Sequence, residues 1–151
     1  MRSRTRPNPF RVFVAYALEL DQLPALKQRI AIARRTAAEY SVDLYYHVED
    51  DQGWNLQGPR DFQEVLSKAF AVMDQCDAVL LDTTSKGNSK RTGLNIEAGY
   101  ARGRGLPIFA LYRTDDPPRM TMALARAAEG YSDDQGFEDA CRRLFSILVS
   151  D

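Results

Sequence analysis

Glu97 is the residue whose surroundings in the chain best suit it for chemistry. It follows a polar loop and stands between Ile96 and Ala98, neighbours that favour a partly buried position. A carboxylate near the start of a helix lies beside free backbone N–H groups and the positive end of the helix dipole, which together favour anions. A glutamate there could act as a nucleophile or stabilise a cationic transition state. The alternative is that Glu97 only complements the helix dipole on a solvated face.

The polar loop before Glu97 supplies groups that could bind an anion. Residues 83–92 are rich in Thr, Ser, Lys, Gly, Asn and Arg. Their hydroxyl and backbone N–H groups could hydrogen bond to phosphate oxygens, and the basic side chains, with Lys86 among them, could supply charge. The candidate substrate-binding residues here are Ser89, Lys90, Arg91, Thr92, Gly93 and Asn95.

Four further candidates lie outside this loop or at its edge. Tyr16 ends the first apolar run of the chain, and Asp82 ends the apolar run before the polar loop. His47 is the single histidine, and histidine suits a general base because its ordinary pKa lies near neutrality; the alternative is a structural residue at a strand end. Trp54 lies in a long loop over residues 49–59, where it could form a lid or stacking wall, or a local anchor.

The apolar pattern predicts strands that alternate with helices. Predicted strands cover residues 10–17, 42–48, 78–81 and 106–112, and predicted helices cover 23–40, 60–75, 119–129 and 133–149. A further helix is expected to begin at Gly93 or Leu94 and to end before Gly103. The pattern also allows a short fifth strand around 128–131.

This order predicts an α/β fold, a flavodoxin-like doubly wound parallel sheet of four or five strands in a three-layer sandwich. Ligands of such sheets bind beyond the carboxyl ends of the strands. Glu97 and Tyr16 are therefore expected near the same edge of the sheet.

Length and composition indicate one globular domain. The chain has 151 residues, of which 44% are hydrophobic and 27% charged. We expect a single domain over residues 10–150 after a disordered basic tail over residues 1–9. The net charge of -1 argues against binding to a nucleic-acid polymer.

The sequence contains no run of about 18 apolar residues, so no membrane span is expected. The first nine residues lack the apolar segment of a signal peptide, and we expect a cytoplasmic protein. Cys76 and Cys141 are interpreted as reduced packing residues. Two cysteines and one histidine do not form a metal site, so neither a metal nor a cofactor is expected.

Three consecutive stretches together resemble the nucleoside 2-deoxyribosyltransferase-like superfamily, which includes 2'-deoxynucleoside 5'-monophosphate N-hydrolases. They are Asp77-Ala-Val-Leu-Leu-Asp82, Gly93-Leu-Asn-Ile-Glu97-Ala-Gly-Tyr-Ala101 and Gly105-Leu-Pro-Ile-Phe. The resemblance extends over most of residues 10–145. It implies a flavodoxin-like homodimer that acts on a nucleoside or nucleotide. The glutamate that matches Glu97 would attack the anomeric carbon of deoxyribose and release the base, and water or another base would then resolve the glycosyl-enzyme.

The chain departs from the family pattern at three places. Ala69 stands where the family usually has an aspartate near the nucleophile, and Arg91 is nearest to the serine of phosphate-accepting relatives. The glycine-rich end of the family's first strand is replaced by Ala15-Tyr16-Ala17. We expect Asp82 to replace the missing acid in part, and Tyr16 to touch the sugar or orient Glu97.

A second resemblance favours a different class of protein. The opening Val12-Phe-Val-Ala-Tyr16 also resembles the start of a TIR domain, which assembles through protein contacts or cleaves nicotinamide from NAD with a glutamate. A degenerate, ligand-sensing relative is a further alternative. The helix motif around Glu97 favours the deoxyribosyltransferase-like interpretation.

Overall fold

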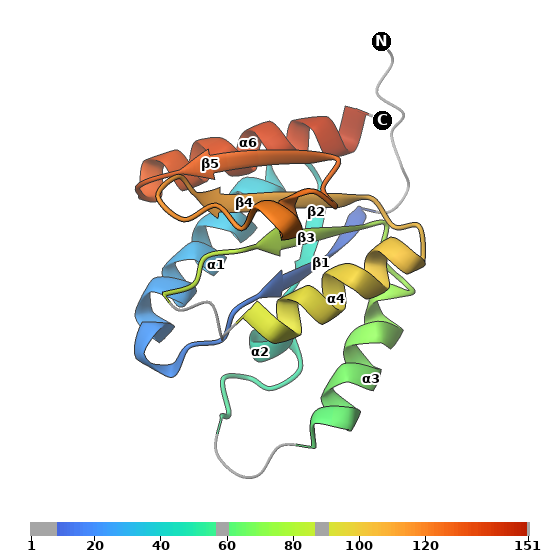
Figure 1. The fold of residues 1–151 in the computed structure, drawn as a ribbon. Helices are drawn as coiled ribbons and strands as arrows, with labels where there is room; N and C mark the ends of the chain where they lie inside the picture. Colours follow the sequence, from blue (N-terminus) through green and yellow to red (C-terminus); the bar gives the residue numbers. More distant parts are fainter. Residues whose placement is uncertain (1–8, 57–60, 87–90, 151) are drawn as a thin grey trace.

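A computed structural model describes residues 9–56, 61–86 and 91–150 (Figure 1). Five strands form one sheet in the order β2-β1-β3-β4-β5, and every neighbouring pair is parallel. The strands are β1 (Phe10–Tyr16), β2 (Val42–Tyr45), β3 (Ala78–Asp82), β4 (Ile108–Arg113) and β5 (Ala127–Tyr131). This order is that of flavodoxin-like folds, so the predicted three-layer α/β architecture is confirmed.

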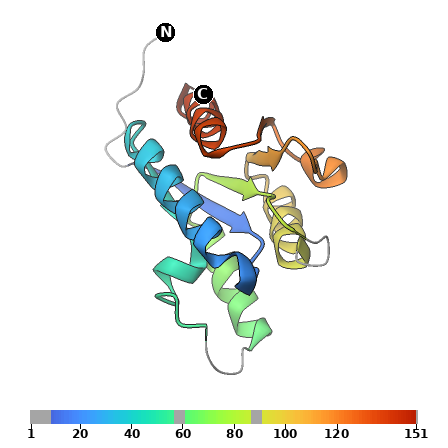
Figure 2. The same cartoon turned by 90° about the vertical axis from the view of Figure 1, so that its left-hand side faces the viewer.

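Helices cover both faces of the sheet (Figures 1 and 2). One face is packed by α1 (Leu23–Ala38), which follows the short 3-10 helix η1 (Leu20–Gln22), and by α6 (Asp134–Ser150). The other face is packed by α3 (Phe62–Met73) and α4 (Thr92–Gly103). Two short helices, α2 (His47–Asp50) and α5 (Arg119–Met122), lie in the connections.

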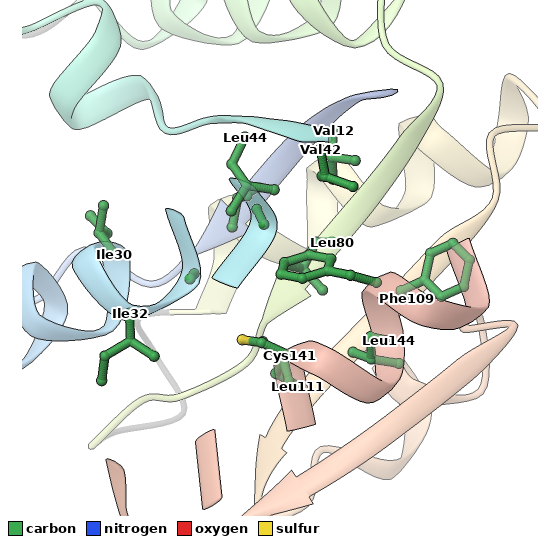
Figure 3. Packing of buried hydrophobic residues seen from close by; sticks show 14 of the residues in the cluster. Val12, Ile30, Ile32, Val42, Leu44, Leu80, Phe109, Leu111, Cys141 and Leu144 are labelled. Carbon is green, nitrogen blue, oxygen red and sulfur yellow. The ribbon is translucent and has the colours of Figure 1, made fainter. Parts of the chain in front are cut away.

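The core consists of two apolar layers, because successive residues of a strand point to opposite faces. Figure 3 shows the first layer, in which Leu80 of β3 lies near Cys141 and Leu144 of α6. In the second layer Leu81 packs with residues of α4 such as Ala98. Burial of both faces explains why β1 and β3 are almost continuously apolar.

The helix that contains Glu97 begins at Thr92, one residue before the earliest predicted start. Arg91 is its N-cap residue, and the helix ends at Gly103. Gly105 follows with a φ of +73°, a left-handed conformation in which glycine carries no steric penalty. Glu97 therefore lies in the second turn of α4, close to the carboxyl end of β3.

The predictions for two segments were wrong in part. The strand predicted over 42–48 ends at Tyr45, because the Tyr46 N–H donates to Asp50 Oδ2 at 2.8 Å and the chain turns into α2. The helix predicted over 119–129 stops at Met122, and residues 127–131 form β5. The small residues there suit a helix, but pairing with β4 prevails, beginning with the 2.7 Å bond from Arg126 N to Ile108 O.

Cys76 and Cys141 are both free and buried, as expected of packing residues. Among the described residues, no helix has both the length and the apolar character that crossing a bilayer requires.

Candidate active site

A cavity of about 400 Å³ lies between the carboxyl end of β1, α2, α3 and α4. β1 pairs with β2 on one side and with β3 on the other, so the connections that follow β1 and β3 leave in opposite directions. Such a switch point opens a crevice at the carboxyl edge of the sheet. The described residues that line the cavity are Phe13, Val14, Tyr16, Leu18, His47, Gln52, Phe62, Val65, Leu66, Ala69, Thr92, Gly93, Ile96 and Glu97.

Glu97 is the only acidic residue among these described lining residues. Its side chain is partly buried, and within residues 9–56, 61–86 and 91–150 its carboxylate has no hydrogen-bond or ion-pair partner. Burial raises the pKa of Glu97 to about 8, because the apolar surroundings disfavour the charged form. Gly93 lies one helical turn earlier on the same face of α4 and also borders the cavity.

Two further predicted residues reach the cavity from other elements. Tyr16 lies at the end of β1, and its hydroxyl oxygen accepts a hydrogen bond from Val48 N at 2.8 Å. His47 begins α2, with Nδ1 at 3.3 Å from the Tyr45 hydroxyl and Nε2 at 3.5 Å from Asp51 Oδ2. Burial raises the pKa of Tyr45 to about 12, so the phenol stays protonated near neutrality and can donate to Nδ1.

Asp82 lies on the wrong face of the sheet to act beside Glu97. It alternates with Leu81, and its side chain turns toward α1, where Arg29 Nε donates to Oδ2 at 2.8 Å. Its other oxygen accepts from Thr84 N at 3.2 Å. The carboxyl group is almost fully buried and does not border the cavity, so the expectation that Asp82 replaces the family's acid is corrected.

Arg91 and Asn95 also point away from the cavity. The guanidinium of Arg91 donates to Thr83 O and to Asp116 Oδ2, both at 2.9 Å. Asn95 Oδ1 accepts from the Thr121 hydroxyl at 2.8 Å. Neither residue borders the cavity, although both were predicted to bind substrate.

The remaining predicted loop residues divide into two pairs. Thr92 and Gly93, at the start of α4, border the cavity. Ser89 and Lys90 lie outside the described residues.

Trp54 serves as a local anchor rather than as a wall of the cavity. Its indole Nε1 donates to Glu49 Oε2 at 3.3 Å, and Lys27 Nζ lies 4.7 Å from the centre of a ring. The side chain packs against the core beside α1. Gln52, from the same loop, borders the cavity instead.

Many of the residues that line the cavity were not predicted from the sequence. The apolar face of α3 supplies Phe62, Val65 and Leu66, and Ile96 of α4 lies opposite the sheet. Phe62 and Ile96 are 69% and 43% exposed, so neither side chain is buried in the core. The sequence does indicate a broad apolar face over residues 60–75, which includes these positions of α3. Ala69 of α3 also borders the cavity.

Comparison with solved structures finds the same architecture in other proteins. A conserved protein of Enterococcus faecalis V583 matches with a TM-score of 0.64, at 15% identity, over 90% of this chain and 99% of that one. A 2-deoxyribosyltransferase of Bacillus psychrosaccharolyticus matches with a TM-score of 0.59, at 14% identity, over 85% of this chain and 90% of that one. A CMP N-glycosidase of Clostridium botulinum matches with a TM-score of 0.56, at 17% identity, over 85% of this chain and 94% of that one. At these identities the likeness shows the fold alone.

Sequence comparison is more specific about the family. No curated protein matches the chain. The sequence model described as nucleoside 2-deoxyribosyltransferase matches residues 20–137, a span that includes α1, α3 and α4. That span contains His47 and Glu97, two of the polar residues that meet at the cavity. The chain therefore belongs to the nucleoside 2-deoxyribosyltransferase family.

Proposed function

We propose that the protein cleaves the N-glycosidic bond of a nucleoside, a deoxynucleoside or its 5'-monophosphate, with Glu97 as the nucleophile. The observation that carries this proposal is a single carboxylate, without a partner among the described residues, in a mostly apolar cavity. A volume of about 400 Å³ falls within the range of small-molecule sites. Membership of the family supports the same reaction class.

The chemistry follows from the position of the carboxylate. As the bond between the anomeric carbon and the base nitrogen breaks, positive charge develops on the sugar, and ionised Glu97 stabilises that charge. A bond then forms between a Glu97 oxygen and the anomeric carbon. Water or a second base attacks this intermediate and restores the carboxylate.

The departing base needs a proton, and His47 is our candidate donor. It shares the cavity with Glu97, and its Nε2 lies 3.5 Å from Asp51 Oδ2. Lys68 Nζ lies 3.6 Å from the other oxygen of Asp51, which holds that carboxylate in place. The hydroxyl of Tyr16 remains a candidate to contact the sugar or to orient Glu97. We further propose nucleosides or nucleotides as the small-molecule partners and a homodimer as the assembly.

The role of His47 predicts a dependence on the leaving group. His47→Gln is expected to lower kcat for natural nucleosides about a hundredfold, because the base must then leave without a proton donor. The same variant should cleave 4-nitrophenyl 2-deoxyriboside nearly as fast as the unmodified protein, since that leaving group needs no proton. Steady-state rates on both substrates provide the measurement. An equal loss on both would assign His47 a structural role.

A base-release screen tests the function itself. Purified protein is incubated with nucleosides, deoxynucleosides, their 5'-monophosphates and NAD, and chromatography detects the free base. We expect release from at least one nucleoside or nucleotide. Release from NAD alone would favour the TIR-like alternative, and release from no compound would favour a ligand-sensing relative.

A further inference from the structure

We infer that Arg91 is a positioning residue that fixes the helix of Glu97, and not a ligand of the substrate's phosphate. The inference rests in part on the proposed function, because positioning matters only if Glu97 reacts. Its structural half stands on the contacts of Arg91, Thr83, Asn95 and Asp116.

Arg91 is the N-cap residue of α4 and its side chain is almost entirely buried. Nε donates to the Thr83 carbonyl, and a terminal nitrogen donates to Asp116 Oδ2, each at 2.9 Å. The side chain of Asp116 is half exposed, whereas that of Arg91 is only 7% exposed. A planar guanidinium binds two acceptors in fixed directions, which a lysine cannot do. Arg91 therefore joins the end of β3, the start of α4 and the turn after β4.

Thr83, whose carbonyl accepts the hydrogen bond from Arg91, is itself held firmly by the sheet. Its backbone N–H and its hydroxyl both donate to Leu111 O in β4, at 3.0 and 2.9 Å. Its side chain is fully buried. The carbonyl that Arg91 binds is thus fixed to the centre of the sheet.

A second link holds the same face of α4. Asn95 lies one turn after Arg91 and accepts a hydrogen bond from Thr121 of α5 at 2.8 Å. Glu97 is two residues after Asn95, about 200° around the helix, and so faces the cavity on the opposite side. The segment after β4 therefore holds one face of α4 while the other face presents the carboxylate.

The arrangement also removes Arg91 from the role that the sequence suggested. A phosphate would have to displace Asp116 and leave the buried Thr83 carbonyl without its donor, which is costly. Arg91 does not border the cavity. Its hydrogen bonds instead hold the start of α4 in place against the sheet. This matters for Glu97, because small displacements of a reacting group reduce reaction rates strongly.

Asp116→Asn, with Asp115→Asn as its matched control, provides the test. Asp115 lies in the same turn but pairs with Arg113, at 3.0 Å from Arg113 Nε, and not with Arg91. Amide hydrogen exchange over residues 94–98 and base-release kinetics are measured for both variants. Arg91→Met and Arg91→Lys complete the set. Because Asp116 is half exposed, its variant is expected to fold even if an Arg91 variant does not.

We expect Asp116→Asn to speed exchange in α4 and to lower kcat about tenfold, with KM changed by less than about twofold. Asp115→Asn should change neither quantity, and Arg91→Lys should retain more activity than Arg91→Met. Unchanged exchange in both Asp116→Asn and Arg91→Met would overturn the inference. So would an Arg91→Met variant that raises KM for monophosphates alone. If no variant or parent protein releases base, the proposed function fails, and the exchange data still decide whether Arg91 holds α4.

Discussion

Glu97→Gln is expected to reduce base release at least about a thousandfold, because an amide cannot form the bond to the anomeric carbon. The substitution keeps the size and shape of the side chain. In the parent protein, a brief incubation with substrate followed by acid quenching should yield a mass increase that corresponds to one deoxyribosyl group. The variant should show no such adduct in mass spectrometry. Chromatography of the free base gives the rate for both proteins.

Glu64→Gln is the matched control for this experiment. Glu64 lies on α3, whose apolar side chains line the cavity, but its own side chain is 66% exposed and it does not border the cavity. Its variant should release base at the parental rate. Full activity of Glu97→Gln, or an equal loss in both variants, would contradict the assignment of the nucleophile.

The position of Glu97 was predictable because it depends on local and periodic features. The apolar run before the polar loop identifies a buried strand, and the loop and glycines delimit the next helix. A glutamate in the early turns of that helix must then lie near the carboxyl edge of the sheet. Tyr16 reaches the same edge for the same reason, since it ends β1. Both residues border the cavity.

The destinations of Asp82, Arg91 and Asn95 were not predictable, because each depends on a partner far away in the sequence. Asp82 pairs with Arg29 from α1, while Arg91 and Asn95 bind residues that follow β4. Hydrophobic periodicity contains no information about which charged side chains will meet across elements.

Trp54 illustrates a different limit of prediction from sequence. Its loop was compatible with a wall of the cavity or with an anchor, and the outcome depended on Glu49 and Lys27. The residue also adopts a φ of 63°, an uncommon conformation outside glycine, and Gly53 before it is left-handed as well. This turn places Gln52 at the cavity and directs the indole toward the core. Sequence patterns do not specify such backbone geometry.

The burial of Glu97 predicts that the protein loses stability as its carboxyl group ionises. In the folded protein its pKa is raised to about 8, whereas in the unfolded chain it is near the ordinary value of 4.5. Between these two pH values the unfolded chain has already released the proton that the folded protein retains. The unfolded state then binds fewer protons, so the free energy of unfolding falls as the pH rises through this window.

Glu97→Gln isolates this effect, because the amide is neutral at every pH and all other titrating groups are common to both proteins. At pH 4 the two proteins should differ by less than about 0.5 kcal/mol. At pH 8 and above the variant should be more stable by roughly 3 to 5 kcal/mol, given about 1.4 kcal/mol for each pKa unit. Urea unfolding at a series of pH values measures the difference directly.

The same pKa governs catalysis, but activity rises with pH where stability falls. The nucleophile reacts only when ionised, so kcat/KM of the parent protein should fall about tenfold for each pH unit below a midpoint near 8. The pH at which the active form accumulates is therefore the pH at which folding is weakened most by this residue. A constant stability difference between pH 4 and 9, together with a kinetic midpoint near 4.5, would mean that Glu97 is solvated and already ionised near neutrality. In that case its site could not use a dry cavity to strengthen the attraction between the carboxylate and the cationic sugar.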